Sequence, residues 1–250
     1  MERTAFVTGG ASGIGREICI ALASDGRRVA VADLNAAGAA ETVAMITDSG
    51  GTAIAVTVDV TSGDSVHDAV FAAVDEFGPV EILVNCAGWD ELMPFLDTDE
   101  AFWDKVIEIN YKGTLRTVHA CLPSMIEAGW GRIVNISSDA ARVGSSLEAV
   151  YSGAKGAIIS FTKTMAREVA RKGVTVNVVC PGPTDTPLLG AIVDASDDGE
   201  KVIGAMARAV PMKRVGQPAE VASAVAYFAS EAAGFATGQT LSVSGGLTMA

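Results

Sequence analysis

Short apolar runs along the chain alternate with longer stretches in which apolar residues recur every three or four positions. The short runs lie at residues 5–8, 28–32, 52–58, 80–84, 132–137, 174–179 and 240–243. Several of them are continuous, without a polar residue at every second position, which is typical of strands buried on both faces of a parallel sheet. The periodic stretches predict helices at residues 13–24, 36–48, 65–77, 100–128, 149–171 and 218–229.

This alternation of strands and helices predicts the fold class. Repeated strand–helix units favour an α/β protein with a doubly wound parallel sheet flanked by helices. Residues 1–250 contain no linker, change of composition or solenoid-type repeat that would divide them. We therefore expect a single-domain Rossmann fold with seven parallel strands.

Composition and charge narrow the functional classes. The 250 residues carry a formal net charge of −12, which weighs against nucleic-acid binding because that function needs a basic face. We find neither a signal-peptide pattern nor an apolar run long enough to cross a membrane, so we expect a cytoplasmic protein. The four separated cysteines and two isolated histidines lack metal-ligand spacing. We therefore expect no metal site, and thiols kept in a reducing compartment.

A glycine-rich turn follows the first predicted strand. It runs from Thr8 to Gly15 with the sequence TGGASGIG, and it opens the helix predicted at 13–24. Glycine lets the backbone approach a pyrophosphate, and a helix N-terminus offers free N–H groups with a positive dipole end. The alternative is a plain strand-to-helix turn, but the first-strand context favours a dinucleotide site. The candidate contacts are Gly9, Ser12, Gly13, Ile14 and Gly15.

An acidic residue at the end of the second predicted strand bears on which dinucleotide binds. Asp33 lies 18 residues after Gly15. A carboxylate there can accept a hydrogen bond from a ribose 2′-OH and would repel a 2′-phosphate. Neighbouring Ala11, Leu34 and Asn35 supply no basic group for such a phosphate. We therefore predict NAD over NADP, with Asp33 and Leu34 as contacts, although Asp33 also suits the start of a turn.

Two further strand ends carry candidate cofactor contacts, since open α/β sheets bind ligands at the carboxyl ends of their strands. Asp59 and Val60 follow the third predicted strand. Asp59 could bond an adenine amino group or cap the next helix, and the residues alone leave both readings open. Asn85, Ala87 and Gly88 follow the fourth strand, and the two small residues leave room for an adenosine.

Tyr151 and Lys155 are the candidates for acid/base chemistry. They are four residues apart in the helix predicted at 149–171, so their side chains share one face. An ammonium about 4 Å from a phenolate favours it by roughly 4 kcal/mol at an effective dielectric near 20, or about three pKa units. Such a pair is more often an ordinary surface feature, so the assignment depends on partners elsewhere in the chain.

The full set of motifs resembles the short-chain dehydrogenase/reductase family in its single-domain form, over essentially the whole chain. The resemblance is carried by residues 8–15, 85–88, Asn110, Ser138, Tyr151 with Lys155, and Pro181-Gly182. One departure is Cys86, where the family usually has a second asparagine beside the adenosine pocket. The resemblance implies an NAD-dependent oxidoreductase that interconverts a secondary alcohol and a ketone and assembles as a homotetramer.

The resemblance also implies a role for each polar residue. Tyr151 would be the acid/base, exchanging the alcohol proton while hydride moves between substrate carbon and nicotinamide. Lys155 would lower the tyrosine pKa and bind the nicotinamide ribose, Ser138 would bind the substrate oxygen, and Asn110 would hold a water linking Lys155 to solvent. Ser137 is the neighbouring candidate for the serine role, but strand alternation would point it the other way. The turn that holds the carboxamide would contribute Pro181, Gly182, Thr184 and Thr186.

Substrate contacts are expected from three segments around this centre. Residues at about 184–210 mix apolar and acidic character and are interpreted as a mobile substrate lid, with a surface helical insertion as the alternative. An apolar pocket would suit a cyclic or aliphatic secondary alcohol. The candidate contacts are Trp89, Met93, Val143, Ser145, Leu147, Glu148, Leu189 and Met206.

Four stretches narrow the substrate further, because they resemble family members that oxidise a ring β-hydroxyacyl-CoA to the β-ketone with NAD⁺. They are residues 87–90, 138–146, 178–186 and 241–249. We therefore expect a cyclic β-hydroxyacyl-CoA. The acidic run at 194–200 disfavours the CoA phosphates, however, and leaves a free cyclic or hydrophobic alcohol open.

Two other functions remain as alternatives. One is a 3-oxoacyl-thioester reductase of fatty-acid type, which Asp33 disfavours because those enzymes commonly use NADPH. The other is a non-catalytic NAD-binding regulatory protein, which the presence of Ser138, Tyr151 and Lys155 disfavours.

Overall fold

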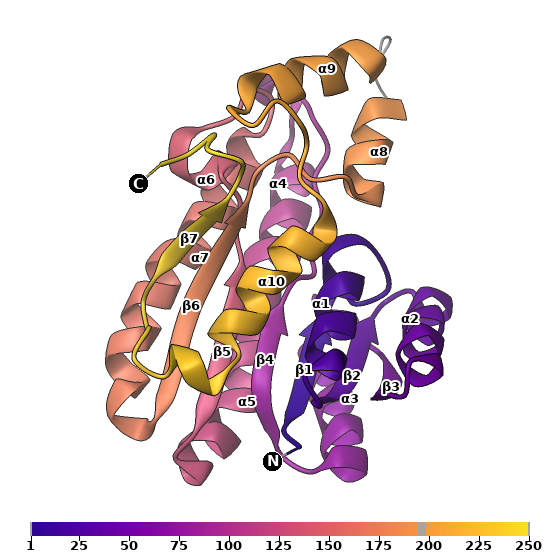
Figure 1. Ribbon diagram of the computed structural model, residues 1–250. Helices are drawn as coiled ribbons and strands as arrows, with labels where there is room; N and C mark the ends of the chain where they lie inside the picture. Colours follow the sequence, from indigo (N-terminus) through magenta and orange to yellow (C-terminus); the bar gives the residue numbers. More distant parts are fainter. Residues whose placement is uncertain (1, 195–198, 250) are drawn as a thin grey trace.

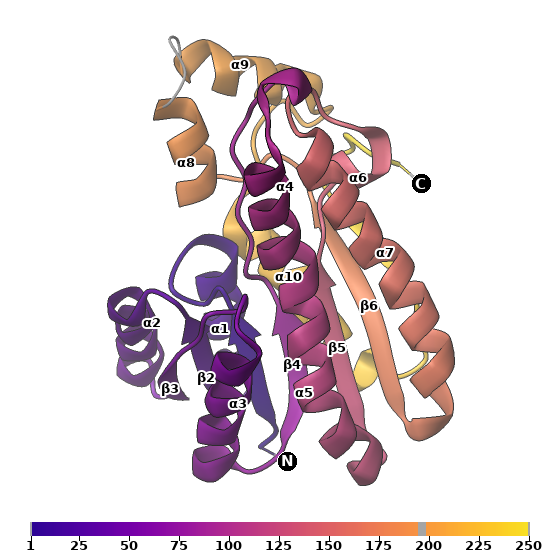
Figure 2. The same cartoon turned by 180° about the vertical axis from the view of Figure 1, so that it is seen from behind.

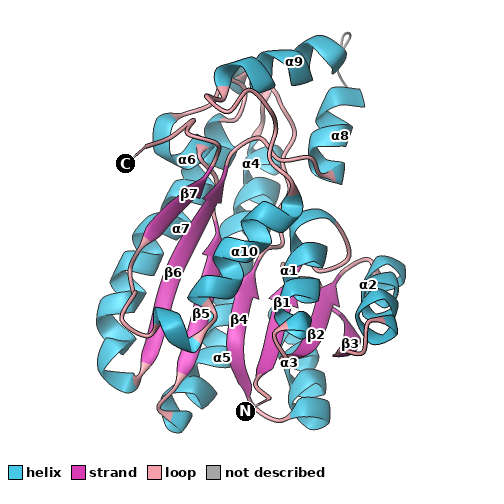
Figure 3. Cartoon of the chain, viewed as in Figure 1, coloured by secondary structure: helices cyan, strands magenta, loops and turns pink. Residues whose placement is uncertain are grey.

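The computed structural model describes residues 2–194 and 199–249, and its centre is one parallel sheet (Figure 1). The sheet has seven strands in the order β3-β2-β1-β4-β5-β6-β7 (Figure 3). The strands are β1 Thr4–Thr8, β2 Arg28–Asp33, β3 Thr52–Thr57, β4 Val80–Asn85, β5 Gly131–Ile136, β6 Val174–Pro181 and β7 Thr240–Val243. This arrangement confirms the predicted Rossmann fold.

Helices cover both faces of the sheet. The α-helices are α1 Gly13–Ser24, α2 Ala36–Asp48, α3 Gly63–Phe77, α4 Glu100–Ile107, α5 Gly113–Ala128, α6 Ala140–Val143, α7 Ala149–Val169, α8 Pro187–Asp194, α9 Gly199–Ala209 and α10 Pro218–Phe228. Helices α1, α2 and α10 lie on the face seen in Figure 1, and helices α3, α5 and α7 lie on the face seen in Figure 2. Short 3-10 turns are η1 Phe95–Asp97, η3 Ala170–Lys172 and η4 Glu231–Ala233.

Two hydrophobic cores explain why the strands are continuously apolar. In β4, Ile82 and Val84 point into the core beneath α1 and α10, whereas Leu83 points into the core beneath α3 and α5. β1 shows the same division, with Val7 on one side and Phe6 on the other. Because the central strands contribute to both cores, most of their residues are apolar, and the buried side chains of Asn85 and Asn135 are hydrogen-bonded to each other.

The segment 100–128 differs from the single helix that its pattern predicts. A π-helical turn, η2 (Glu108–Lys112), separates α4 from α5. Asn110 lies in this turn, and its Nδ2 donates a hydrogen bond to the carbonyl oxygen of Val106, 2.9 Å away. The side chain thus uses an acceptor that a backbone N–H takes in a regular α-helix, which accounts for the local widening.

The region predicted as a lid forms two helices, α8 and α9. They lie at the top of Figure 1, beyond the carboxyl ends of the strands. Residues 195–198 of the predicted acidic run lie outside the described residues. The role of this region as a substrate lid stays a prediction.

Membrane-spanning and metal-binding features are absent from the described part of the chain. None of its helices combines the length and the apolar character needed to cross a bilayer. Nor do the described residues include three or more His, Cys, Asp or Glu side chains placed to hold one metal ion.

The double-sided core makes a direct stability prediction. We expect Leu83→Ala to lower the free energy of unfolding by about 2–5 kcal/mol, because it removes a fully buried side chain and leaves a cavity. Urea denaturation followed by circular dichroism measures the change. Leu96→Ala is the matched control, since Leu96 is 92% exposed and should change stability little. Equal losses for the two variants would contradict this description of the core.

Candidate active site

A cavity of about 590 Å³ opens at the carboxyl ends of the strands, between the sheet and the helices α8 and α9. Parallel strands all end at the same edge, so residues far apart in sequence meet there. From the predicted cofactor and catalytic set, the cavity is lined by Gly9, Ser12, Gly13, Ile14, Gly15, Asp33, Ala87, Gly88, Ser138, Tyr151, Lys155, Pro181, Gly182, Thr184 and Thr186.

The glycine turn is folded tightly enough to require glycine. Gly9 and Gly13 have φ angles of 72° and 52°, in the left-handed region. A Cβ at Gly15 would lie 2.0 Å from the carbonyl oxygen of Gly9, so no other residue fits without a backbone shift. Ser12 makes no side-chain cap to α1, which leaves the first N–H groups of the helix free for an anion. These residues fit the pyrophosphate of a dinucleotide.

Asp33 lies at the rim of the same cavity and ties two loops together. Its Oδ2 accepts a hydrogen bond from the backbone N–H of Ala11 at 2.9 Å, and its Oδ1 accepts one from Asn35 at 2.8 Å. Arg16 also lies against this turn, where it bonds the carbonyl oxygen of Ala11 and pairs with Glu41. The guanidinium of Arg16 is therefore engaged by protein groups, and Asp33 lines the cavity.

The catalytic candidates meet at the floor of the cavity. Tyr151 and Ser138 both line it, and the hydroxyl oxygen of Ser138 accepts a hydrogen bond from the backbone N–H of Ala140 at 3.1 Å. The Nζ of Lys155 lies 5.6 Å from the centre of the Tyr151 ring and donates a hydrogen bond to the carbonyl oxygen of Ile136 at 3.0 Å. Ser137 donates its hydroxyl to the carbonyl oxygen of Lys155 at 2.8 Å, so its side chain is occupied in holding α7. Ser138 is the serine that faces Tyr151.

The titration of this pair differs from the sequence-based expectation. Burial, followed by the charges of Asp90 and Glu148, raises the pKa of Tyr151 well above its ordinary value, and the nearby hydroxyl of Ser138 opposes this only in part. Burial also lowers the pKa of Lys155 to about 8. Desolvation and the two carboxyl groups thus act against the phenolate in the protein alone, and the lowering of the tyrosine pKa by Lys155 stays a prediction.

Asn110 positions the loop after β4 instead of facing the cavity. Its Oδ1 accepts a hydrogen bond from the backbone N–H of Trp89 at 3.2 Å, and its Nδ2 donates to the carbonyl oxygen of Trp89 at 2.7 Å. Gly88 fits between Asn110 and Lys155, since a Cβ there would lie 2.9 Å from the former's Oδ1 and 3.3 Å from the latter's Nζ. Asn110 thus fixes the backbone beside the lysine.

Four predicted cofactor contacts lie outside the lining of the cavity. The side chain of Asn85 is buried between Asn135 and Thr117, with hydrogen bonds of 2.8 and 2.5 Å. Asp59 accepts bonds from the backbone and hydroxyl of Thr61, which lower its pKa, and Ser62 is the residue that caps α3. The other two are Val60, buried against Gly113, and Leu34, which is exposed.

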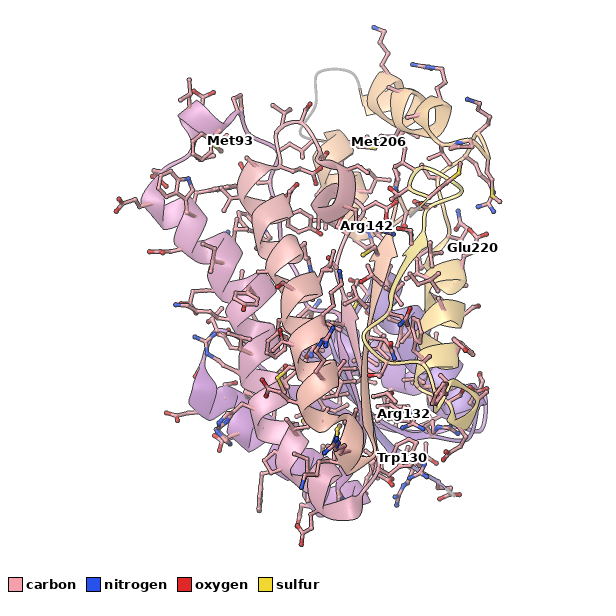
Figure 4. All side chains as sticks on the ribbon, turned by 90° about the vertical axis from the view of Figure 1, so that its left-hand side faces the viewer. Met93, Trp130, Arg132, Arg142, Met206 and Glu220 are labelled. Atoms are coloured by element: carbon pink, nitrogen blue, oxygen red, sulfur yellow. The ribbon has the colours of Figure 1, made fainter. Side chains whose placement is uncertain are left out.

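The predicted substrate residues divide into two groups. Val143, Ser145, Glu148, Leu189 and Met206 line the main cavity. Met93 and Leu147 line a smaller neighbouring cavity that also reaches Tyr151. Figure 4 shows Met93, Arg142 and Met206 at the end of the molecule where the strands finish, with Trp130 and Arg132 at the opposite end.

The side chain of the predicted substrate residue Trp89 makes its contacts outside the lining of the main cavity. The Nζ of Lys105 lies 3.4 Å from the centre of its ring, and the edge of the ring meets Phe102 at 5.7 Å between centroids. These contacts anchor the loop after β4 to α4, so the tryptophan supports the site from outside the cavity.

Sequence reasoning included Asp90 and Leu247 only within the stretches 87–90 and 241–249 and named neither as a site residue. Leu247, close to the end of the chain, lines the main cavity. Asp90 is only 6% exposed and lies near Tyr151. Its position two residues after the 85–88 motif was the available signal, but burial of a carboxyl group depends on contacts made far along the chain.

Comparisons with known proteins extend over almost the whole chain. A family model described as enoyl-(acyl carrier protein) reductase matches residues 9–248. The acetoacetyl-CoA reductase of Allochromatium vinosum is 40% identical over 251 residues, covering 100% of both chains. A 3-oxoacyl-[acyl-carrier-protein] reductase of Staphylococcus epidermidis is 36% identical over 250 residues, also covering 100% of both.

A solved structure agrees with these relatives. The crystal structure of an actinorhodin polyketide ketoreductase with NADPH superposes with a TM-score of 0.94 at 37% identity, covering 98% of this chain and 97% of that one. Fold, cavity and relatives together define an oxidoreductase of the NAD(P)-binding α/β class. The chain belongs to the short-chain dehydrogenase/reductase family.

The role of Asn110 in holding the loop after β4 can be tested with the variant Asn110→Ala. This change leaves the carbonyl oxygens of Val106 and Trp89 and the N–H of Trp89 without a side-chain partner in a buried place. We expect the free energy of unfolding to fall by about 1–3 kcal/mol, measured by urea denaturation. An unchanged midpoint would show that the loop is held by other contacts.

Proposed function

We propose that the protein interconverts a 3-oxoacyl thioester and the corresponding 3-hydroxyacyl thioester with NAD(H). The observation that carries this proposal is that Ser138, Tyr151 and Lys155 line one cavity together with a glycine-rich phosphate turn, with the Nζ of Lys155 5.6 Å from the centre of the Tyr151 ring. The proposed substrate class follows relatives named as acetoacetyl-CoA and 3-oxoacyl-[acyl-carrier-protein] reductases.

Tyr151, Ser138 and Lys155 each have a separate role in the proposed reaction. When bound, NAD(H) supplies or accepts the hydride. In reduction, the hydroxyl of Tyr151 donates its proton to the ketone oxygen, and the hydroxyl of Ser138 donates a hydrogen bond to the same oxygen. The ammonium of Lys155 favours the phenolate that remains on Tyr151. In oxidation, each proton transfer runs in reverse.

The preference for NAD(H) over NADP(H) rests on Asp33. Its carboxylate faces the cavity, already orients two backbone amides, and would repel the additional phosphate of NADP(H). Arg16 does not offset this repulsion, because its guanidinium is engaged by Ala11 and Glu41. The related ketoreductase was solved with NADPH, so this preference would separate the two proteins.

The cyclic substrate is the second candidate. The sequence stretches at 138–146 and 241–249 resemble 2-hydroxycyclohexanecarboxyl-CoA dehydrogenase. Val143 and Leu247, which belong to those stretches, line the cavity together with Leu189 and Met206 on the predicted lid. The apolar lining supports a ring or an alkyl chain equally, whereas the named relatives favour the open-chain thioester.

Assembly and location complete the proposal. Gly153 and Gly156 on α7 have open space or only a distant contact at the Cβ position, which supports close packing against a second copy in a homotetramer. The resemblance to acyl-carrier-protein reductases supports a cytoplasmic enzyme. We infer that α8 and α9 act as the lid over the substrate.

A substrate panel tests the function. We expect NADH-dependent reduction of acetoacetyl-CoA, and weaker reduction of the corresponding free ketones. Tyr151→Phe should lower turnover by about 10²–10⁴-fold, because the proton donor is lost, while nicotinamide fluorescence still reports NADH binding. Tyr227→Phe is the control, since Tyr227 is 49% exposed and remote from the cavity lining. Full turnover by Tyr151→Phe would overturn the mechanism, and turnover confined to cyclic substrates would favour the second candidate.

Substitution of Asp33 tests the predicted preference for NADH over NADPH. We expect the wild-type protein to bind NADH about 10–100-fold more tightly than NADPH, since a charged hydrogen bond contributes roughly 1.5–3 kcal/mol. Asp33→Asn keeps the shape but removes the charge, so the ratio of the two dissociation constants, measured by nicotinamide fluorescence, should shrink. Asp25→Asn, at an exposed position, should leave the ratio unchanged. Tighter binding of NADPH to the wild type would refute the assignment.

A further inference from the structure

The short helix α6, which follows Ser138, cannot hold its shape unaided. It spans only Ala140–Val143, and one helical turn is unstable in isolation because its few hydrogen bonds do not offset the ordering of the backbone. The hydroxyl oxygen of Ser138 depends on this turn, since it accepts a hydrogen bond from the backbone N–H of Ala140. That bond leaves the hydroxyl proton of Ser138 for another acceptor. The direction of this proton therefore depends on whatever holds α6 in place.

Besides its packing on α7, helix α6 is tied to the last strand by a side-chain network. The hydroxyl of Ser242, on β7, donates a hydrogen bond to Oδ1 of Asp139 at 2.5 Å and accepts one from Nη1 of Arg142 at 2.6 Å. The backbone N–H of Arg142 donates to the carbonyl oxygen of Asp139 at 2.9 Å, which closes a ring. These three residues are called the α6 anchor below. The α6 anchor joins two of the stretches on which the substrate prediction depends, residues 138–146 and 241–249.

Burial makes the α6 anchor dependent on the hydroxyl of Ser242. Asp139 is only 2% exposed, and among the described residues Ser242 alone donates a hydrogen bond to its carboxylate, since Oδ2 has no partner there. A buried carboxylate is costly unless protein groups bond it. Loss of the hydroxyl would therefore favour any shift of α6 that brings this carboxylate to water.

The strand that supplies Ser242 is itself held from two directions. The backbone N–H of Gly182, in the turn predicted to hold the carboxamide, donates to the carbonyl oxygen of Val243 at 3.0 Å. The backbone N–H of Met212, which follows α9, donates to the carbonyl oxygen of Gly245 at 3.2 Å. Ser242 is therefore a fixed point against which α6 is set.

We propose that Asp139, Arg142 and Ser242 are positioning residues that direct the hydroxyl of Ser138 toward the substrate oxygen. The proposal rests on the proposed function, because it presumes that Ser138 binds that oxygen. The three residues act through Ser138 and take no part in bond making. The glycine-rich turn follows β1, which three strands separate from β7. Loss of the α6 anchor should therefore lower turnover and leave the binding of NADH unchanged.

Removal of one hydroxyl tests the α6 anchor. Ser242→Ala should lower kcat for ketone reduction by about 10–100-fold, because small misplacements of catalytic groups have effects of this size. The dissociation constant of NADH, measured by nicotinamide fluorescence, should stay the same. Ser242→Thr keeps the hydroxyl at a strand position that suits threonine, and should recover most of the turnover.

The same strand offers a matched control. Thr240 lies two residues before Ser242 on the same side of β7, and its buried hydroxyl has no hydrogen-bond partner among the described residues. Thr240→Val removes that hydroxyl with little change of shape, so kcat should not change. An equal loss in Thr240→Val and Ser242→Ala would overturn the inference, because it would show a general effect of altering β7.

A double-mutant cycle separates positioning of Ser138 from a general loss of structure. Ser138→Ala alone should lower kcat. Adding Ser242→Ala to it should lower kcat no further, because the α6 anchor acts through a hydroxyl that is already absent. Losses that multiply would refute the positioning role, even when the wild type reduces thioesters.

Backbone hydrogen exchange tests the α6 anchor without turnover. Exchange of the peptide containing residues 138–144, followed by mass spectrometry, should be faster in Ser242→Ala than in the wild type or in Thr240→Val. Equal exchange in all three proteins would overturn the inference. Failure of the wild type to reduce thioesters would instead refute the proposed function. The cycle is then run with whichever ketone or alcohol of the panel the wild type accepts, and the exchange measurement needs no substrate.

Discussion

The ammonium of Lys155 is buried, and the arrangement of the site depends on keeping it there. A buried cation is costly unless protein groups replace its water. The carbonyl oxygen of Ile136 accepts a hydrogen bond from Nζ, and Ser137 holds the backbone of Lys155. Gly88 lets the neighbouring loop pass close to the same nitrogen. The end of β5, the start of α7 and the loop after β4 are thus fixed relative to one charge.

Most of the fold could be predicted from the sequence, because buried parallel strands and amphipathic helices have different apolar periods. The predicted strand bounds agree with the structure to within two residues, as at β4 and β6. The break at η2 could not be predicted, since its cause is the side chain of Asn110 taking a backbone acceptor. That choice depends on the loop of Trp89, which meets Asn110 only in the folded chain.

The site was predictable in its composition and less so in its electrostatics. The turn at 8–15, Asp33, Ser138, Tyr151 and Lys155 all meet in one cavity, because their motifs sit at strand ends that share an edge. The spacing of Tyr151 and Lys155, however, allowed only an estimate of how the ammonium lowers the tyrosine pKa at one assumed dielectric constant. It could not reveal that Lys155 is buried and Tyr151 half-buried, or that Asp90 would be folded in beside them.

Leu247 lines the same cavity as Gly9, so the site is built from both ends of this sequence. The phosphate turn is synthesised more than two hundred residues before Leu247. A nascent chain therefore cannot complete the substrate pocket until residue 247 has emerged. Synthesis of the final strand and the residues after it sets the earliest moment at which the site is complete.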